Sequence, residues 1–133
     1  MSESTAAQAA AASPKPVTNA FEASIRSPLP TIVEFLIEVL GGPLVMRIAG
    51  RSDPTALAGW VDGTRKPRAA ADKRLRIAYR VFLTIQAADS DHVARAWFVG
   101  LNPQLGDVSP VEALRADRHL DVVTAAAAFV QTS

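Results

Sequence analysis

Apolar side chains recur at helical spacing along most of this chain, and no stretch alternates between apolar and polar residues. The helical repeat, which places every third or fourth residue on one face, is followed most clearly by Ile32, Phe35, Leu36, Val39 and Leu40. Because a half-buried strand needs a period of two, the sequence predicts an all-α fold. At 133 residues, the chain suits one small helical bundle or two very small ones.

Glycine, proline and capping residues divide the chain into short helices. We expect helices over about 31–40, 43–49, 54–61 and 68–88, and others beginning near Ser90, Pro110 and Arg118. The expected caps are Thr31 for the first helix and Ser52 or Asp53 for the third, with Gly63 ending the third in a left-handed conformation. In the helix after Ser90, the side chains of Val93, Ala96 and Trp97 are expected to face the core.

The chain divides into three stretches. Residues 1–20 are rich in Ala, Ser and Pro and nearly free of large apolar side chains, so they cannot offset the entropy of ordering. We therefore expect a disordered tail over 1–28, a helix-turn-helix-like region over 29–88 and a C-terminal region over 89–133. The start does not fit a secretory signal and no apolar run is long enough to cross a membrane, so we expect a cytoplasmic protein.

The residue types leave little room for catalysis. The chain has no cysteine and only two histidines, His92 and His119. No carboxylate pair, nucleophile with its base, or phosphate-binding glycine loop occurs at a suitable spacing. The sequence predicts no enzyme, no catalytic residue, no metal site and no cofactor.

Charge is distributed unevenly along the chain. The total is only +1, but residues 44–80 carry nine basic and three acidic side chains, whereas residues 81–133 have a net charge of −3. A basic segment of this kind suggests a polyanionic partner. Solvated basic helix faces with no such partner remain the alternative.

A short helix, a tight turn, a second short helix and a basic loop form the layout of a helix-turn-helix. Residues 48–67 resemble this unit in phage-repressor-like regulators, with Trp60 near the end of the recognition helix and a Gly-x-x-x-Pro loop from Gly63 to Pro67. A plain helical bundle with a short crossing helix is the alternative. Few side chains could read base edges here, so we expect salt-sensitive contacts mostly to phosphates. The expected DNA contacts are Arg51, Ser52, Thr55, Arg65, Lys66, Arg68 and Lys73.

Residues 97–114 resemble the C-terminal domain of the MbcA/ParS/Xre antitoxin family. The hallmarks are a Trp at a helix end, Asn-Pro-x-Leu-Gly, and Pro-x-Glu-x-Leu opening the next helix. They fall on Trp97, Asn102, Pro103, Leu105, Gly106, Pro110, Glu112 and Leu114. These residues are expected to be mostly structural: the two leucines and Trp97 in the core, Gly106 at positive φ, and Ser109 with Glu112 as a capping box.

The resemblance implies an antitoxin of a type II toxin–antitoxin system. In that family the upstream module binds DNA or dimerises, and the C-terminal domain holds a RES-domain toxin that consumes NAD⁺. The family usually has a glycine in the turn before the last helix, where this chain has residues 116–119 (Ala-Asp-Arg-His). The implied toxin contacts are Arg115, Arg118, His119, Asp121, Val122 and Phe129.

The last helix supports a protein partner independently. Residues 122–130 are apolar nearly all round, so as a helix they must be covered on more than one face. Either the protein's own core or another chain could provide that cover. We expect another chain, in a hetero-oligomer with the toxin or by self-association. Two alternatives remain: a helix-turn-helix DNA-binding transcriptional regulator that dimerises without a toxin partner, and an adaptor that binds a protein but not DNA.

Overall fold

A computed structural model describes residues 16–132, and within them the protein is all-α, as the sequence predicts. Among these residues, the only strand-like pairing is a single bridge between Asn102 and Val108. The α-helices are α2 (Pro16–Arg26), α3 (Leu29–Leu40), α4 (Gly42–Ala49), α5 (Pro54–Asp62), α6 (Ala69–Ala88), α7 (Asp91–Val99), α8 (Pro110–Arg115) and α9 (His119–Thr132), with a 3-10 turn, η1 (Pro103–Leu105), before α8.

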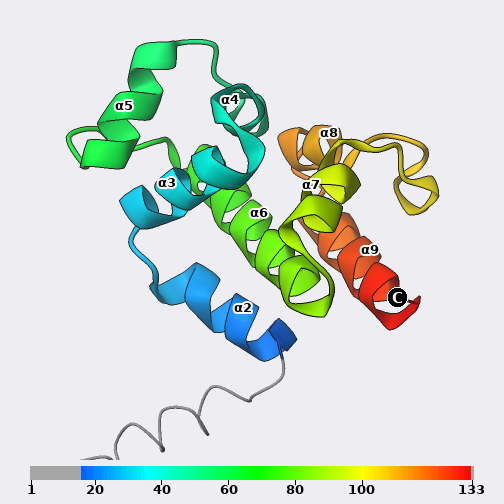
Figure 1. The fold of residues 1–133 in the computed structure, drawn as a ribbon. Helices are drawn as coiled ribbons and strands as arrows, with labels where there is room; N and C mark the ends of the chain where they lie inside the picture. The colour runs from blue at the N-terminus through cyan, green and yellow to red at the C-terminus, as the bar shows by residue number, and fades with distance from the viewer. Residues whose placement is uncertain (1–15, 133) are drawn as a thin grey trace, which may run out of the picture.

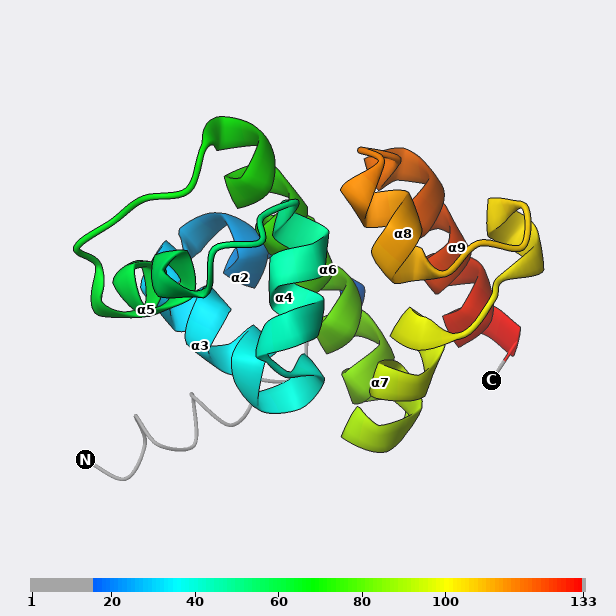
Figure 2. The ribbon, with the colours of Figure 1, turned by 90° about the horizontal axis from the view of Figure 1, so that it is seen from above.

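Helix α6 runs through the middle of the molecule, with α2–α5 on one side and α7–α9 on the other (Figure 1; Figure 2). Its buried residues follow the helical repeat and belong to one hydrophobic core that reaches from α3 to α9. The Phe82 ring lies 5.6 Å from that of Phe35 and 5.8 Å from that of Phe98. The two sides of the molecule are therefore packed against a shared helix.

The expected helices are all present, with small differences at their ends. Helix α3 begins at Leu29 with Pro28 as its cap, so the expected cap at Thr31 is wrong. Pro30 explains the earlier start, because a proline in the first turn removes an N–H that would have no acceptor. Asp53 caps α5, and Gly63 ends it at φ 81°, as expected.

The largest correction concerns the predicted tail. Residues 1–15 lie outside the described residues, but Pro16–Arg26 form helix α2, which packs along α6. Small side chains make this possible, because Ala20 and Ser24 are buried and let the two helices approach closely. Arg76 of α6 then donates to the carbonyls of Ser24 and Ser27, at 2.9 Å each. Helix α2 was missed because its packing on α6 uses small side chains and not the large apolar residues that a core usually contains.

Helix α7 presents a different face from the one expected. Ala94 and Phe98 are buried, whereas Ala96 is exposed and Val93 and Trp97 are only half-buried. The inward stripe is thus shifted by one residue, because Phe98 and not Trp97 contacts Phe82 in the core. None of the helices in the described part is both long and apolar enough to span a membrane.

Candidate functional site

Helices α4 and α5 are two short helices joined by a tight turn over residues 50–53, which is the layout that the sequence predicts. Gly50 closes α4 in the left-handed region, at φ 75°, and its N–H donates to the Arg47 carbonyl at 3.1 Å. A side chain there would be strained, and its Cβ would lie 2.8 Å from Nη1 of Arg74. On α5, Ala56 and Trp60 are buried, so this tryptophan belongs to the core.

The start of α5 is occupied by its own cap. Asp53 Oδ1 accepts from the Thr55 backbone N–H at 3.0 Å and from the Thr55 hydroxyl at 2.7 Å. These two hydrogen bonds are the main cause of the lowered pKa of Asp53, with smaller contributions from Arg65 and Arg51. Arg65 in turn donates to the Thr55 hydroxyl at 3.4 Å. Thr55 is exposed, but its hydroxyl is engaged in this network and is not free to read a base.

Gly59 lets the stem of Arg65 lie across α5. A Cβ on Gly59 would meet Cδ, Cγ and Cβ of Arg65 at 2.6, 2.7 and 2.8 Å, and the Arg65 N–H donates to the Gly59 carbonyl at 3.1 Å. The loop after α5 is thereby fixed against the helix, with the Arg65 side chain directed back towards Thr55.

Several arginines of the basic segment are structural. Arg47 makes a two-pronged ion pair with Glu112, with Nε–Oε2 at 2.6 Å and Nη2–Oε1 at 3.0 Å. The pair joins α4 to α8 and lowers the pKa of Glu112. Arg80 stacks over the Phe21 ring, 4.7 Å from its centroid, and Arg76 holds Asp72 and the end of α2.

Among the described arginines that form ion pairs, Arg74 has the least exposed side chain. Its Nε and Nη2 donate to the Asp117 carboxylate at 2.8 and 3.2 Å, and its Nη1 donates to the Ala49 carbonyl at 3.0 Å. Asp117 adopts a left-handed φ of 63° in the turn before α9, at the place where the antitoxin family has a glycine. Asp tolerates this conformation better than most residues, and Arg74 lowers the pKa of its carboxyl group.

The remaining cations carry the predicted DNA surface. The side chains of Arg51, Lys66, Arg68 and Lys73 have no hydrogen-bond or ion-pair partner among the described residues. Arg51 and Arg68 line one pocket, and Arg65 and Lys66 line another at the end of α5. Ser52 is exposed on the turn. The structure therefore brings six of the seven predicted residues to the α4–α5 turn and the loop that follows α5.

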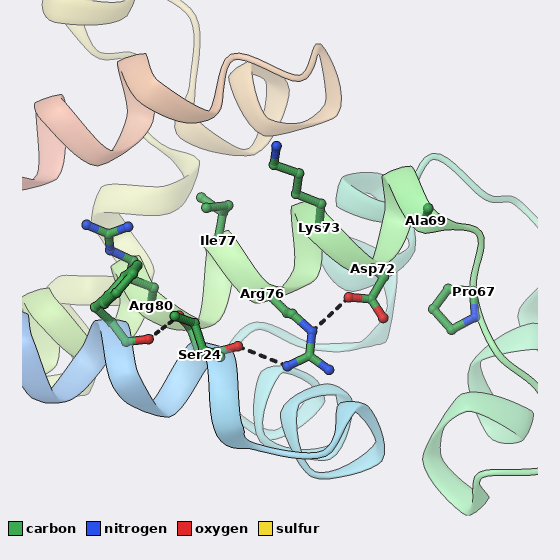
Figure 3. A pocket seen from close by; sticks show the side chains of 10 residues that line it. Ser24, Pro67, Ala69, Asp72, Lys73, Arg76, Ile77 and Arg80 are labelled. Carbon is green, nitrogen blue, oxygen red and sulfur yellow. Dashed lines mark hydrogen bonds and ion pairs between the residues drawn. The ribbon is translucent and has the colours of Figure 1, made fainter.

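Lys73 is the exception, because it lines a different pocket of about 630 Å³ between α2 and α6 (Figure 3). Phe21, Ile25 and Ile77 form its apolar wall, and Figure 3 shows Lys73 directed away from α2. Lys73 also contributes to lowering the pKa of His119, next to the last helix. It is not part of the helix-turn-helix surface.

The C-terminal motif folds largely as the sequence suggests. The Asn102 side chain accepts from the Gln104 N–H at 2.9 Å, Leu105 and Leu114 are buried, and Gly106 has φ 75°. Ser109 caps α8 by accepting from the Glu112 N–H at 3.2 Å. The other half of the expected capping box is wrong, because the Glu112 carboxylate is held by Arg47 instead.

The predicted toxin contacts on α9 are only partly available. Val122 is 0% exposed and faces the core, so its assignment as a contact is wrong. Arg118 bonds Asp121 and donates to the Leu105 carbonyl, both at 3.0 Å. The His119 side chain is 18% exposed, and burial is the main cause of its lowered pKa. Arg115 is exposed beside α4, and its Nη1 donates to the Arg47 carbonyl at 3.3 Å.

A surface that the sequence did not reveal lies between α7 and the C-terminal part of α9. Two adjoining pockets, of about 280 and 320 Å³, share Trp97, Leu101, Asn102 and Phe129, which together we call the Trp97 face. The Leu101 side chain is 75% exposed, so it contributes little to the core of the protein itself. The sequence offers one indication of this surface: Leu101 is a large apolar residue in a loop, between Gly100 and Asn102.

Helix α9 is covered on one side only. Val122, Ala125 and Ala126 are buried in the core with α6, whereas Leu120, Thr124 and Ala127 are exposed. The protein's own core thus covers part of the apolar run. Cover of the outer side by another chain stays a prediction.

Among the described residues, no group of histidine and acidic side chains is arranged to hold a metal ion. Comparison with models of protein families, with characterised proteins and with solved structures finds no match to this chain. The functional interpretation therefore rests on the chain's own geometry and on its sequence motifs.

Proposed function

We propose that this protein is an antitoxin of a type II toxin–antitoxin system: it binds and neutralises a RES-domain, NAD-consuming toxin in the cytoplasm and has a separate surface for its operator DNA. The observation that carries the partner role is the Trp97 face, an apolar surface built on the segment that resembles the antitoxin family. A leucine as exposed as Leu101 at the mouth of two pockets is typical of a protein-binding surface.

The location of this face agrees with the sequence motifs. Trp97 lies in the last turn of α7, Asn102 caps the turn η1, and Phe129 lies on α9. One surface therefore combines the segment that resembles the family with the last helix. Aromatic residues surrounded by half-buried apolar neighbours are typical anchors of protein interfaces. Arg115 and Asp121 are exposed, and they stay the expected polar contacts.

A coexpression experiment tests this proposal. We expect a RES-domain toxin encoded beside this gene to arrest growth when expressed alone, and this protein to restore growth and copurify with it. Leu101→Asp should weaken the complex at least tenfold, because it places a charge in the centre of an apolar contact. Ile25→Asp is the matched control, since Ile25 is also a large exposed apolar residue, at 60%, but lies on α2, outside both pockets.

One result would contradict the antitoxin role, and another would contradict the proposed binding surface. One is a full-length protein that neither binds nor neutralises the neighbouring toxin. The other is equal binding by the Leu101→Asp and wild-type proteins, which would remove the Trp97 face from the complex.

The alternative function, a DNA-binding regulator without a toxin partner, is favoured by a different observation. The α4–α5 unit is well formed, and Arg51, Lys66 and Arg68 stand beside it without carboxylate partners. Reversing Arg65, Lys66 and Arg68 to Glu should abolish duplex binding and leave toxin binding intact. Absence of duplex binding by the wild-type protein at about 50 mM salt would remove the DNA role, because phosphate contacts are strongest at low salt.

A further inference from the structure

A pocket of about 250 Å³ opens between the α4–α5 turn and the first turn of α6. Three of its lining residues are arginines, Arg51, Arg68 and Arg74, and the others are alanine or glycine. No acidic side chain lines it. We call it the arginine pocket.

Two of these arginines have uncompensated charges. The side chains of Arg51 and Arg68 form no hydrogen bond or ion pair with any described residue, and Asp53, which interacts electrostatically with Arg51, is already engaged with Thr55. Like charges that share one pocket repel each other, so their convergence favours an anion between them. The charged groups are thus arranged for an external partner.

Arg74 gives the pocket a rigid wall. Its side chain is only 16% exposed and is fixed by Asp117 and by the Ala49 carbonyl. A guanidinium carries five N–H donors, and three N–H···O contacts are accounted for by these two partners. Arg74 therefore keeps donors in a fixed position beside Arg51 and Arg68.

The small residues make the pocket accessible to an oxyanion. Gly50, Ala70 and Ala71 place no bulk over the backbone, and the Arg68 side chain does not cap α6. The backbone N–H groups of the first helical turn can then add to the arginine donors. The fork of a guanidinium matches two oxygens of a phosphate, which a carboxylate-free pocket of this size can admit.

We propose that the arginine pocket binds a phosphate group through Arg51 and Arg68, with Arg74 as a fixed wall. The phosphate comes either from a nucleic-acid backbone or from a free phosphate compound. The site does not depend on the toxin partnership. If the ligand is backbone phosphate, it deepens the proposed DNA role by locating one contact beside the start of α5.

The test follows backbone amide signals of the full chain by NMR in two separate titrations, one with inorganic phosphate and one with a short duplex of random sequence. We expect the amides of Gly50, Ala70 and Ala71 to shift, because they line the pocket. Shifts with both ligands indicate a general phosphate site, and shifts with the duplex alone assign the ligand to the DNA backbone. Shifts with phosphate alone keep the site but remove the DNA role.

Paired variants separate the pocket from general charge. Arg51→Gln with Arg68→Gln should remove these shifts and weaken binding at least tenfold. Arg26→Gln with Arg95→Gln removes the same charge from exposed residues outside the pocket and should leave the shifts in place. The proposal is overturned if neither ligand shifts these amides, or if both double variants lose the response equally.

Discussion

Substitution of Gly59 by Ala tests the close approach of α5 to the loop that follows it. Intrinsic helix propensity alone predicts a gain of about 1 kcal/mol in unfolding free energy, since Gly59 lies inside a helix. The structure predicts the opposite sign. The new Cβ would lie 2.6–2.8 Å from three carbons of Arg65.

The magnitude depends on which Arg65 atom must move. Cδ and Cγ can rotate away, but Cβ is attached to a backbone whose N–H is bonded to the Gly59 carbonyl. Overpacking of this kind costs about 1–3 kcal/mol, so after the propensity gain we expect a net loss of up to about 2 kcal/mol. For a chain of this size, each kcal/mol lowers Tm by roughly 3–5 °C.

Urea unfolding followed by circular dichroism measures the change. Ala58→Gly is the control, because Ala58 is exposed on the same helix and should lose only the propensity of about 1 kcal/mol. A double-mutant cycle with Arg65→Gly, which removes the three opposing carbons, should show that the two substitutions are coupled and that Gly59→Ala becomes favourable. If Gly59→Ala stabilises the protein on its own, the loop moves freely and the close contact has no energetic importance.

Three further predictions concern stability. Leu105→Ala should cost about 2–5 kcal/mol in urea unfolding, because Leu105 is buried; a loss below about 1 kcal/mol would mean that the loop is not anchored there. Ser109→Ala should cost about 1 kcal/mol by removing the cap of α8, and an unchanged unfolding midpoint would contradict this. Because burial lowers the pKa of His119, the unfolded chain takes up the proton first as pH falls below about 6.5. Stability should therefore decrease from that pH down to the folded-state pKa, and His119→Leu should remove this decrease; an unaltered pH profile in the variant would refute the assignment.

Local signals explain why most helix ends were predictable. Asp53 and Ser90 cap their helices through hydrogen bonds to residues two or three positions away, and Gly63 and Gly106 adopt the left-handed conformations that their places in the sequence suggest. Such interactions depend on neighbouring residues only. The helix-turn-helix layout, which is built from them, could be inferred for the same reason.

Contacts between distant residues were beyond the sequence. Glu112 has the spacing of a capping box, but Arg47, 65 residues away, takes its carboxylate. Arg74 and Asp117 are separated by 43 residues, so no local pattern indicates that this arginine is structural. The half-buried position of Trp97 likewise depends on how α7 is rotated against α6. This rotation buries Phe98 and places Trp97 at the edge of the core.

The position of α6 limits how the two surfaces could be separated. Phe82 and Ile85, near its C-terminal end, are buried in the same core as Phe98, so a fragment cut at residue 88 would leave these side chains uncovered. A fragment beginning at residue 89 would lose the helix on which α9 packs. Neither half would keep its core without α6, so the proposed DNA surface and the proposed partner surface both depend on this one helix.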